Sequence, residues 1–224
     1  MTAPGGRPRE VVLLDLDGTL TDNFAGISRS IVHALAALGE PAPDPSTLTD
    51  CVGPPLRYSF ARLLATDDGA RIERAIVHYR ERYSATGWHE NVVYAGIPAM
   101  LVALRHGGRR LLLCTSKPQP FAERIVERFD LGGHLAGVYG ADLGGTLDDK
   151  GALVAHIVAR ERLEPARCAM VGDREHDILA ARRHGIRAIG VLWGYGSRAE
   201  LERAGADAIA ADPGSLPPCI DADG

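Results

Sequence analysis

A run of four aliphatic residues, Val11–Leu14, passes directly into Asp15–Thr19 (DLDGT). The apolar run predicts a fully buried strand. Two carboxylates two residues apart on an extended chain point to the same side, and Gly18 then permits a sharp turn. Because like charges repel and desolvated charge is costly, this pair of acids favours a bound cation, and Mg²⁺ suits such hard oxygen ligands. A strand followed by an ordinary polar turn is the simpler interpretation, but it leaves the paired acids unexplained.

Length and charge narrow the classes of protein to which the chain can belong. Its 224 residues, 46% of them hydrophobic, can build one large domain or a core with an inserted smaller domain. The net charge of −4 and the isoelectric point of about 6.1 leave no basic footprint for nucleic acid or an anionic membrane. Residues 1–10 lack the apolar stretch of a signal peptide and are expected to form a flexible tail. We therefore expect no nucleic-acid partner and no membrane partner.

The cysteines are widely spaced and form no Cys-x-x-Cys pair: Cys51, Cys114, Cys168 and Cys219. Cys114 and Cys168 lie in apolar, strand-like runs. This pattern favours buried reduced thiols over disulfides or zinc ligands, as in a cytoplasmic protein.

The basic residues are strongly biased toward arginine. Of 25 Lys and Arg residues only two are lysines, Lys117 and Lys150. Lysine carries a compact point charge and arginine a planar fork, so two positions that retain lysine suggest tight polar pockets. The alternative explanation is that these two lysines have been kept by chance.

Residues 23–93 are predicted to form an all-helical insertion. Apolar residues recur at helical spacing over 24–38, and further helices are expected over 56–65 and 70–84. The segment holds no lysine and is flanked on both sides by segments that contain strands.

An alternation of strands and helices predicts a doubly wound, parallel (Rossmann-like) α/β core over 11–22 and 94–213. The expected strands cover 11–14, 111–114, 135–139, 168–171, 188–192 and 208–211. The expected helices cover 97–104, 121–129, 150–160, 178–184 and 197–204. Residues 214–224 are expected to form a flexible C-terminal tail.

Polar side chains follow several of these strands at the point where each strand ends. They are Asp15 with Asp17, Thr115 with Ser116, and Asp173 with Asp177. Because ligands bind beyond the carboxyl ends of parallel strands, these groups are expected to converge at one rim of the sheet. Each has an ordinary explanation by itself, since acids favour helix N-termini and hydroxyls often end strands. Their order along the chain is what indicates a functional site.

In this order the segments resemble the four motifs of the haloacid dehalogenase superfamily of phosphotransferases. The matching segments are Asp15–Thr19, Thr115 at a strand end, Lys150 at a helix start, and Asp173 with Asp177. The resemblance implies that Asp15 is a nucleophile that forms an aspartyl-phosphate and that Asp17 is the general acid and base. It also implies Mg²⁺ bound by Asp15, the backbone carbonyl of Asp17, and Asp173. Asp177 would orient these ligands or bind the metal through water.

The resemblance also implies the contacts to phosphate. The Thr115 hydroxyl would bind a phosphoryl oxygen, and Lys150 would offset the negative charge of nucleophile and phosphate. Further candidate phosphate contacts are Gly18, Thr19, Ser116 and Lys117. Lys117 is a rival for the role of Lys150, ranked second because it lies so close to Thr115.

Three segments look most like the phosphoglycolate-phosphatase-like group of this superfamily: Gly53–Arg57 (GPPLR), Gly172–Asp177 (GDREHD) and Gly190–Gly196 (GVLWGYG). Members of that group carry a small α-helical cap after the first motif, which implies that residues 23–93 are the cap. Arg57 is a candidate contact for a substrate carboxylate or second phosphate, and an exposed helix arginine is an equally good explanation. His176 and Tyr195 are near-rim candidates for which ordinary packing is the simpler reading.

The resemblance implies a Mg²⁺-dependent phosphatase that hydrolyses a small phosphorylated metabolite, as a monomer or homodimer. Members of this group act on many phosphomonoesters, so 5′-nucleotidase specificity is an alternative, as is a phosphosugar mutase of the same fold. A catalytically inactive binding module ranks last. Asp17 argues against the dehalogenase branch, which lacks that acid. The phosphonate-cleaving branch uses a lysine in its cap, and residues 23–93 have none.

Overall fold

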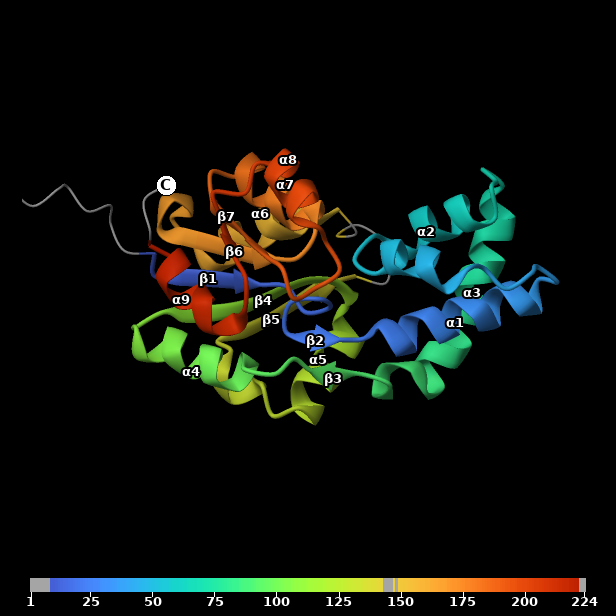
Figure 1. Cartoon of the computed structure of the whole chain (residues 1–224), viewed down its shortest axis with the longest axis horizontal. Coiled ribbons are helices and arrows are strands. Elements are labelled where there is room, and N and C mark those ends of the chain that lie inside the picture. Colours follow the sequence, from blue (N-terminus) through green and yellow to red (C-terminus); the bar gives the residue numbers. More distant parts are fainter. Residues whose placement is uncertain (1–8, 143–146, 148, 222–224) are drawn as a thin grey trace, which may run out of the picture. The chain divides into compact units, whose positions relative to one another are not determined.

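The computed structural model describes residues 9–142, 147 and 149–221. Compact packing divides the chain into two units (Figure 1). Unit 1 holds the chain up to Leu20 and from Val93 onward, and unit 2 holds Thr21–Val92. The part of the expected N-terminal tail that covers residues 1–8 lies outside the described residues.

Unit 1 is built around a six-stranded sheet in the order β5-β4-β1-β6-β7-β8. All neighbouring strands pair in parallel. The strands are β1 (Val11–Leu14), β4 (Arg110–Pro118), β5 (Gly137–Ala141), β6 (Cys168–Gly172), β7 (Arg187–Val191) and β8 (Ala208–Ala210). The predicted doubly wound parallel α/β fold is confirmed, with β1 between β4 and β6 at the centre of the sheet.

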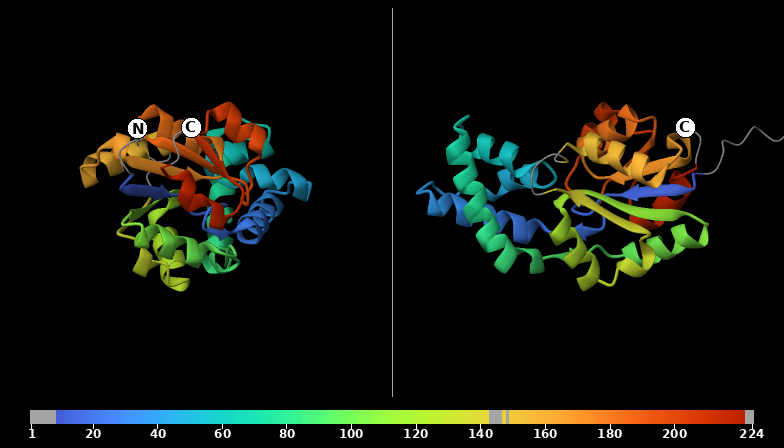
Figure 2. Two further views of the ribbon diagram at one scale, coloured as in Figure 1. Left: turned by 60° about the vertical axis from the view of Figure 1, so that its left-hand side comes forward. Right: turned by 180° about the vertical axis from the view of Figure 1, so that it is seen from behind.

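Helices cover both faces of this sheet, as the two views of Figure 2 show. One layer consists of α6 (Lys150–Glu161), α7 (Glu175–Arg183) and α8 (Arg198–Ala204), and the other of α4 (Ile97–His106), α5 (Gln119–Arg128) and α9 (Leu216–Cys219). Val11 and Leu13 pack in one cluster with apolar residues of the first layer. Val12 and Leu14 are equally buried and point to the second layer, because successive side chains on a strand alternate between faces. This two-sided burial explains the unbroken aliphatic run of β1.

Unit 2 contains α1 (Phe24–Ala37), α2 (Leu56–Leu63) and α3 (Gly69–Ala85), with 3₁₀ turns at Pro45–Cys51 and Gly87–His89. Its core includes an aromatic ladder in which Phe60 meets Tyr79 edge-on and Tyr79 stacks on Tyr83 with ring centroids 5.4 Å apart. The amide of Asn23 donates to the Tyr83 hydroxyl at 2.6 Å, which satisfies a buried phenol at the start of α1.

Two short strands, β2 (Thr21–Asp22) and β3 (Val92–Val93), form a separate sheet that the sequence pattern did not predict. Strands of two residues are too short to show an alternation of polar and apolar residues. They lie where the chain passes between the two units.

The strand β4 extends to Pro118, four residues beyond the predicted end. Its pairing with β5 shifts register between Thr115 and Pro118. The Gln119 side chain ties the end of β4 to β5 at this irregularity, donating to the carbonyl of Val138 at 3.0 Å and accepting from the backbone of Gly140 at 2.5 Å. The segment 115–117 is therefore held in the sheet and not in a loose loop.

The expected C-terminal tail over 214–224 is wrong for residues up to 221. Residues 213–219 form a 3₁₀ turn followed by α9, and Leu216 and Ile220 are fully buried. Asp221 then pairs with Arg109 at 2.5 Å and accepts the backbone N–H of Arg9 at 2.9 Å. Three prolines and a small number of apolar residues hid this segment from the sequence pattern. Among the described helices, none has the length and hydrophobicity needed to cross a membrane.

Replacement of the fully buried Leu13 by alanine tests the central packing of β1. Because the side chain leaves a cavity beneath a helical layer, we expect the free energy of unfolding to fall by about 2–5 kcal/mol. Val102→Ala on α4, where the side chain is 39% exposed, is the matched control and should cost less than about 1 kcal/mol. Urea denaturation followed by circular dichroism measures both. Equal effects of the two substitutions would contradict this packing.

Candidate active site

The segment after β1 places two carboxylates at the carboxyl end of the sheet. The N–H of Asp15 donates to the carbonyl of Val171 at 3.0 Å, which carries the β1–β6 pairing one residue further. Gly18 then turns the chain with a φ of 85°. A side chain at Gly18 would overlap the carboxylate of Asp173, so glycine is required here for both backbone and space. The Thr19 hydroxyl donates to Asp173 Oδ1 at 3.4 Å, which joins the turn to the end of β6.

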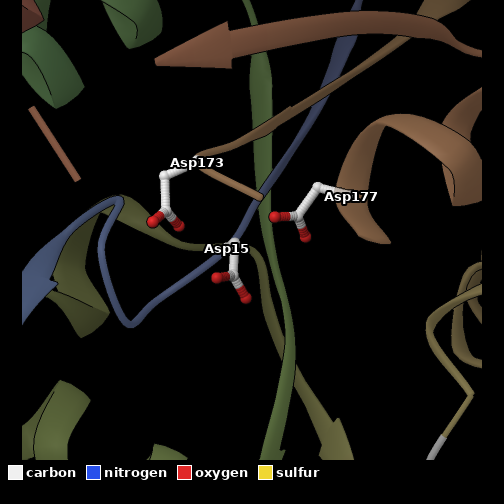
Figure 3. A group of neighbouring side chains, drawn as sticks. All are labelled: Asp15, Asp173 and Asp177. Atoms are coloured by element: carbon white, nitrogen blue, oxygen red, sulfur yellow. The ribbon is translucent and has the colours of Figure 1, made fainter. Parts of the chain in front are cut away.

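Three aspartates from separate elements meet at this rim (Figure 3): Asp15 after β1, Asp173 after β6 and Asp177 in the first turn of α7. Each contributes one carboxylate oxygen to a group whose members all lie within 4.8 Å of one another. All three are buried, and Asp173 is fully so. The helix α7 begins at Glu175, earlier than predicted, so Asp177 lies at its third position and accepts the backbone N–H of Arg174 at 3.3 Å.

This crowding of acids has a clear electrostatic consequence. Burial, with further contributions from Asp177 and Asp15, raises the pKa of Asp173 well above its usual range. Burial also raises the pKa of Asp177 to about 6, against the opposing effect of Lys150. The cluster is therefore unfavourable as three unneutralised carboxylates.

Lys150 supplies part of the missing positive charge. It opens α6, whose N-terminus is capped by the Asp149 side chain accepting from the backbone of Ala152 at 2.8 Å. Its Nζ lies 2.6 Å from Asp15 Oδ1 and 2.9 Å from Asp177 Oδ1. Burial alone disfavours the ammonium, but these two carboxylates outweigh it and raise the pKa of Lys150, so it stays charged.

Lys117 makes a second, separate buried ion pair. Its Nζ lies 2.7 Å from Asp17 Oδ2, and both side chains are largely shielded from solvent. The two lysines of the chain therefore serve different acids of the Asp15–Thr19 segment. The extension of β4 makes this possible, because it holds Lys117 beside the strand end instead of in an exposed loop.

Thr115 is buried, and its Oγ1 accepts the backbone N–H of Lys117 at 3.2 Å. That bond fixes the position of the Thr115 hydroxyl oxygen, and the same hydroxyl group can still donate its own hydrogen. Ser116, half-buried, follows directly in the strand. The structure thus places Asp15, Asp17, Thr115, Lys117, Lys150, Asp173 and Asp177 at the rim of unit 1.

Arg57 belongs to unit 2. It lies in the first turn of α2, where its guanidinium pairs with Glu73 of α3 at 2.6 Å, and it is 61% exposed. Tyr195 contributes to the rim through its backbone N–H, which donates to Asp173 Oδ2 at 2.8 Å. Sequence reasoning did not identify the bond from Trp193 Nε1 to the carbonyl of Thr19, at 2.9 Å. The feature of the sequence that pointed to this loop was the pair of aromatic residues, each followed by a glycine, in Gly190–Gly196.

The donor set fits a hard divalent cation. It offers buried carboxylate oxygens from three residues, with no sulfur or imidazole ligand among the described residues of the cluster. A divalent cation would offset both the burial of the carboxylates and the repulsion among them, which together raise the pKa values of Asp173 and Asp177.

Comparison with known proteins assigns the family. The model of the haloacid dehalogenase-like hydrolase family matches residues 12–191. A 5′-nucleotidase of Pseudomonas aeruginosa is 45% identical over 85% of this chain and 86% of that protein. The tyrosine-protein kinase PtkA of Mycobacterium tuberculosis is 43% identical over 87% of this chain and 66% of that protein. A phosphoglycolate phosphatase of Pseudomonas putida is 29% identical over 86% of this chain and 72% of that protein.

The solved structures agree with this result. A predicted phosphatase from Clostridium acetobutylicum superimposes with a TM-score of 0.90 at 36% identity, covering 94% of this chain and 97% of that one. The chain belongs to the haloacid dehalogenase-like hydrolase family. Within that family it is a phosphatase of the phosphoglycolate-phosphatase-like group.

The raised pKa of Asp173 sets a pH dependence for the stability of the metal-free protein. An ordinary aspartate ionises at about pH 4, so between that pH and the raised pKa of Asp173 the folded protein binds more protons than the unfolded chain. Stability therefore falls as pH rises through the folded-state pKa, and is highest below the unfolded value.

Asp173→Asn should remove this cost together with the metal site. In EDTA we expect the melting temperature to rise by a few degrees, and to rise more at pH 8 than at pH 5. Stabilisation by added Mg²⁺ should be lost. Differential scanning fluorimetry measures both effects, and Glu202→Gln, an exposed acid on α8, is the control that should change neither. A lower melting temperature at every pH would contradict this account of the cluster.

Proposed function

We propose that the protein is a Mg²⁺-dependent phosphatase that hydrolyses a small phosphomonoester through an aspartyl-phosphate on Asp15. The observation that carries the proposal is the arrangement around Asp15. One of its oxygens is held by the Lys150 ammonium at 2.6 Å, and Asp17 lies two residues on with its own buried lysine. The proposed nucleophile and the proposed acid–base group are thus each paired with a different lysine, so each carboxyl group has its own positioning partner.

In the first step an oxygen of Asp15 attacks phosphorus. The bond from phosphorus to the ester oxygen breaks, and Asp17, which enters this step protonated, gives its proton to the departing alcohol oxygen and becomes a carboxylate. In the second step the carboxylate of Asp17 takes a proton from water as the water oxygen attacks phosphorus. The bond from phosphorus to Asp15 then breaks, which releases phosphate and restores both aspartates.

The two lysines support different stages of this sequence. Lys150 offsets the charge that gathers on Asp15 and the phosphoryl oxygens, while Thr115 donates its hydroxyl to one of those oxygens. Lys117 orients the Asp17 carboxyl and stabilises the carboxylate that acts as base in the second step. The backbone of Gly18 and Thr19, with Ser116, completes the proposed phosphate cradle. Mg²⁺ held by Asp15, the Asp17 carbonyl and Asp173 would neutralise and align the phosphate oxygens, with Asp177 holding this set in place.

For the substrate we propose a small phosphorylated metabolite, selected by unit 2 as a helical cap. The name of the Pseudomonas aeruginosa relative favours a nucleoside monophosphate, and that of the Pseudomonas putida relative favours phosphoglycolate. We place the enzyme in the cytoplasm as a monomer or homodimer. All four cysteines are free, and three are buried, which suits a reducing compartment.

Phosphate release from a panel of phosphomonoesters tests the proposal directly. The panel includes nucleoside monophosphates, phosphoglycolate and sugar phosphates, each with Mg²⁺ and with EDTA. We expect Mg²⁺-dependent release that Asp15→Asn lowers on the order of 10³-fold or more, because the nucleophile is lost. Asp50→Asn, an exposed acid of unit 2, should keep full activity.

Other outcomes would redirect the assignment. Isomerisation of a sugar phosphate without phosphate release would indicate a mutase. Phosphate transfer from ATP to protein tyrosine would match the name of the Mycobacterium tuberculosis relative instead. Folded protein with no activity on any compound would overturn the proposal and leave a binding module.

A matched pair of variants tests whether Arg57 recognises the substrate. If Arg57 binds a substrate carboxylate or second phosphate, Arg57→Ala should raise KM about 10-fold with little change in kcat. Glu73→Ala removes the partner of Arg57 but keeps the guanidinium, so its KM should stay near the wild-type value. Steady-state kinetics on the best substrate of the panel decides the matter. If both variants keep a KM near the wild-type value, Arg57 does not bind the substrate and only pairs with Glu73 on the surface between α2 and α3.

A further inference from the structure

The loop between β7 and α8 contacts the turn that follows the nucleophile. Trp193 lies in this loop, and its indole N–H donates to the carbonyl of Thr19 at 2.9 Å. The bond joins positions 174 residues apart in the sequence. Trp193 is only partly buried, so its ring is not held there as a core residue.

The same loop also holds Asp173. The backbone N–H of Tyr195 donates to Asp173 Oδ2 at 2.8 Å, and the Thr19 hydroxyl donates to Asp173 Oδ1 at 3.4 Å. Each oxygen of this carboxylate therefore has a donor, one from the loop and one from the turn. Trp193 joins the two segments that supply these donors.

The approach between loop and turn leaves no room for a side chain. A Cβ at Gly194 would overlap both the carbonyl of Gly18 and the carboxylate of Asp173. Gly194, the residue that follows Trp193, therefore packs directly against both the Asp15–Thr19 turn and Asp173. A shift of the loop would move both groups.

From this geometry we infer that Trp193 is a positioning residue that holds the Asp15–Thr19 turn and Asp173 in register for binding Mg²⁺. The inference rests on the proposed function, because it takes the acid cluster as the metal site. Partners outside the ligand set commonly fix ligand orientation, and their loss typically weakens metal binding about 10–100-fold. The indole N–H acts here through a backbone carbonyl rather than on the metal.

Trp193→Phe tests the inference, because it keeps an aromatic ring and removes the donor. Isothermal titration of the substrate-free protein with Mg²⁺ should show a Kd raised about 10-fold or more. The Mg²⁺ concentration for half-maximal activity should rise equally, while kcat at saturating Mg²⁺ stays close to wild type. The melting temperature in EDTA should change little. The matched control is Trp88→Phe, which changes the second tryptophan of the chain. Trp88 lies in unit 2, so this variant should bind Mg²⁺ normally.

The Trp88→Phe protein also gives a second measurement that does not depend on altering Trp193. With Trp193 as its single tryptophan, emission should change on Mg²⁺ addition with the midpoint found by calorimetry. Wild-type Mg²⁺ affinity in Trp193→Phe, or no emission change during binding, would overturn the role of Trp193 and leave the proposed function intact. Absence of Mg²⁺ binding by the wild type would overturn the metal dependence and this role together.

Discussion

Repulsion among buried carboxylates is the constraint around which unit 1 is organised. Three aspartates converge where neighbouring strands end, in a place with too little solvent to screen them. Lys150 compensates in part by pairing with Asp15 and Asp177, while Lys117 forms a separate pair with Asp17. The fold therefore stores an electrostatic cost at the site where a phosphate and a divalent cation would be bound. Such a cost is expected at a binding site, where a bound cation supplies the positive charge that the folded protein itself lacks.

The rest of unit 1 makes that cost tolerable. The strand β1 is buried on both faces and paired on both edges, so the chain that leads to Asp15 is held as firmly as any segment of the protein. Asp173 directly follows the adjacent strand β6, and Lys150 and Asp177 lie in the first turns of α6 and α7, which pack over the same face. The charged groups thus project from rigid elements. The short segments around Gly18 and Trp193 depend instead on contacts between loops.

Much of this arrangement could be predicted from the sequence. The aliphatic run Val11–Leu14 indicated a central strand, and the alternation after residue 94 indicated a parallel sheet. The rarity of lysine drew attention to Lys117 and Lys150 before their partners were known. The C-terminal helix was missed because its prolines and short apolar pattern do not show that Leu216 and Ile220 fill the core. The two-residue strands β2 and β3 were missed because their pairing is non-local.

The sequence by itself determined the type of sheet, the rim at which the polar groups would gather and the identity of the acids, because these follow from local periodicity and from the order of residues at strand ends. Only the tertiary structure decided which lysine faces which aspartate, and that Trp193 reaches Thr19. Those pairings depend on the register shift that extends β4 and on the approach of two loops far apart in the chain. Distances of a few ångströms between such segments are set by packing across the whole sheet, which no local pattern of residues records.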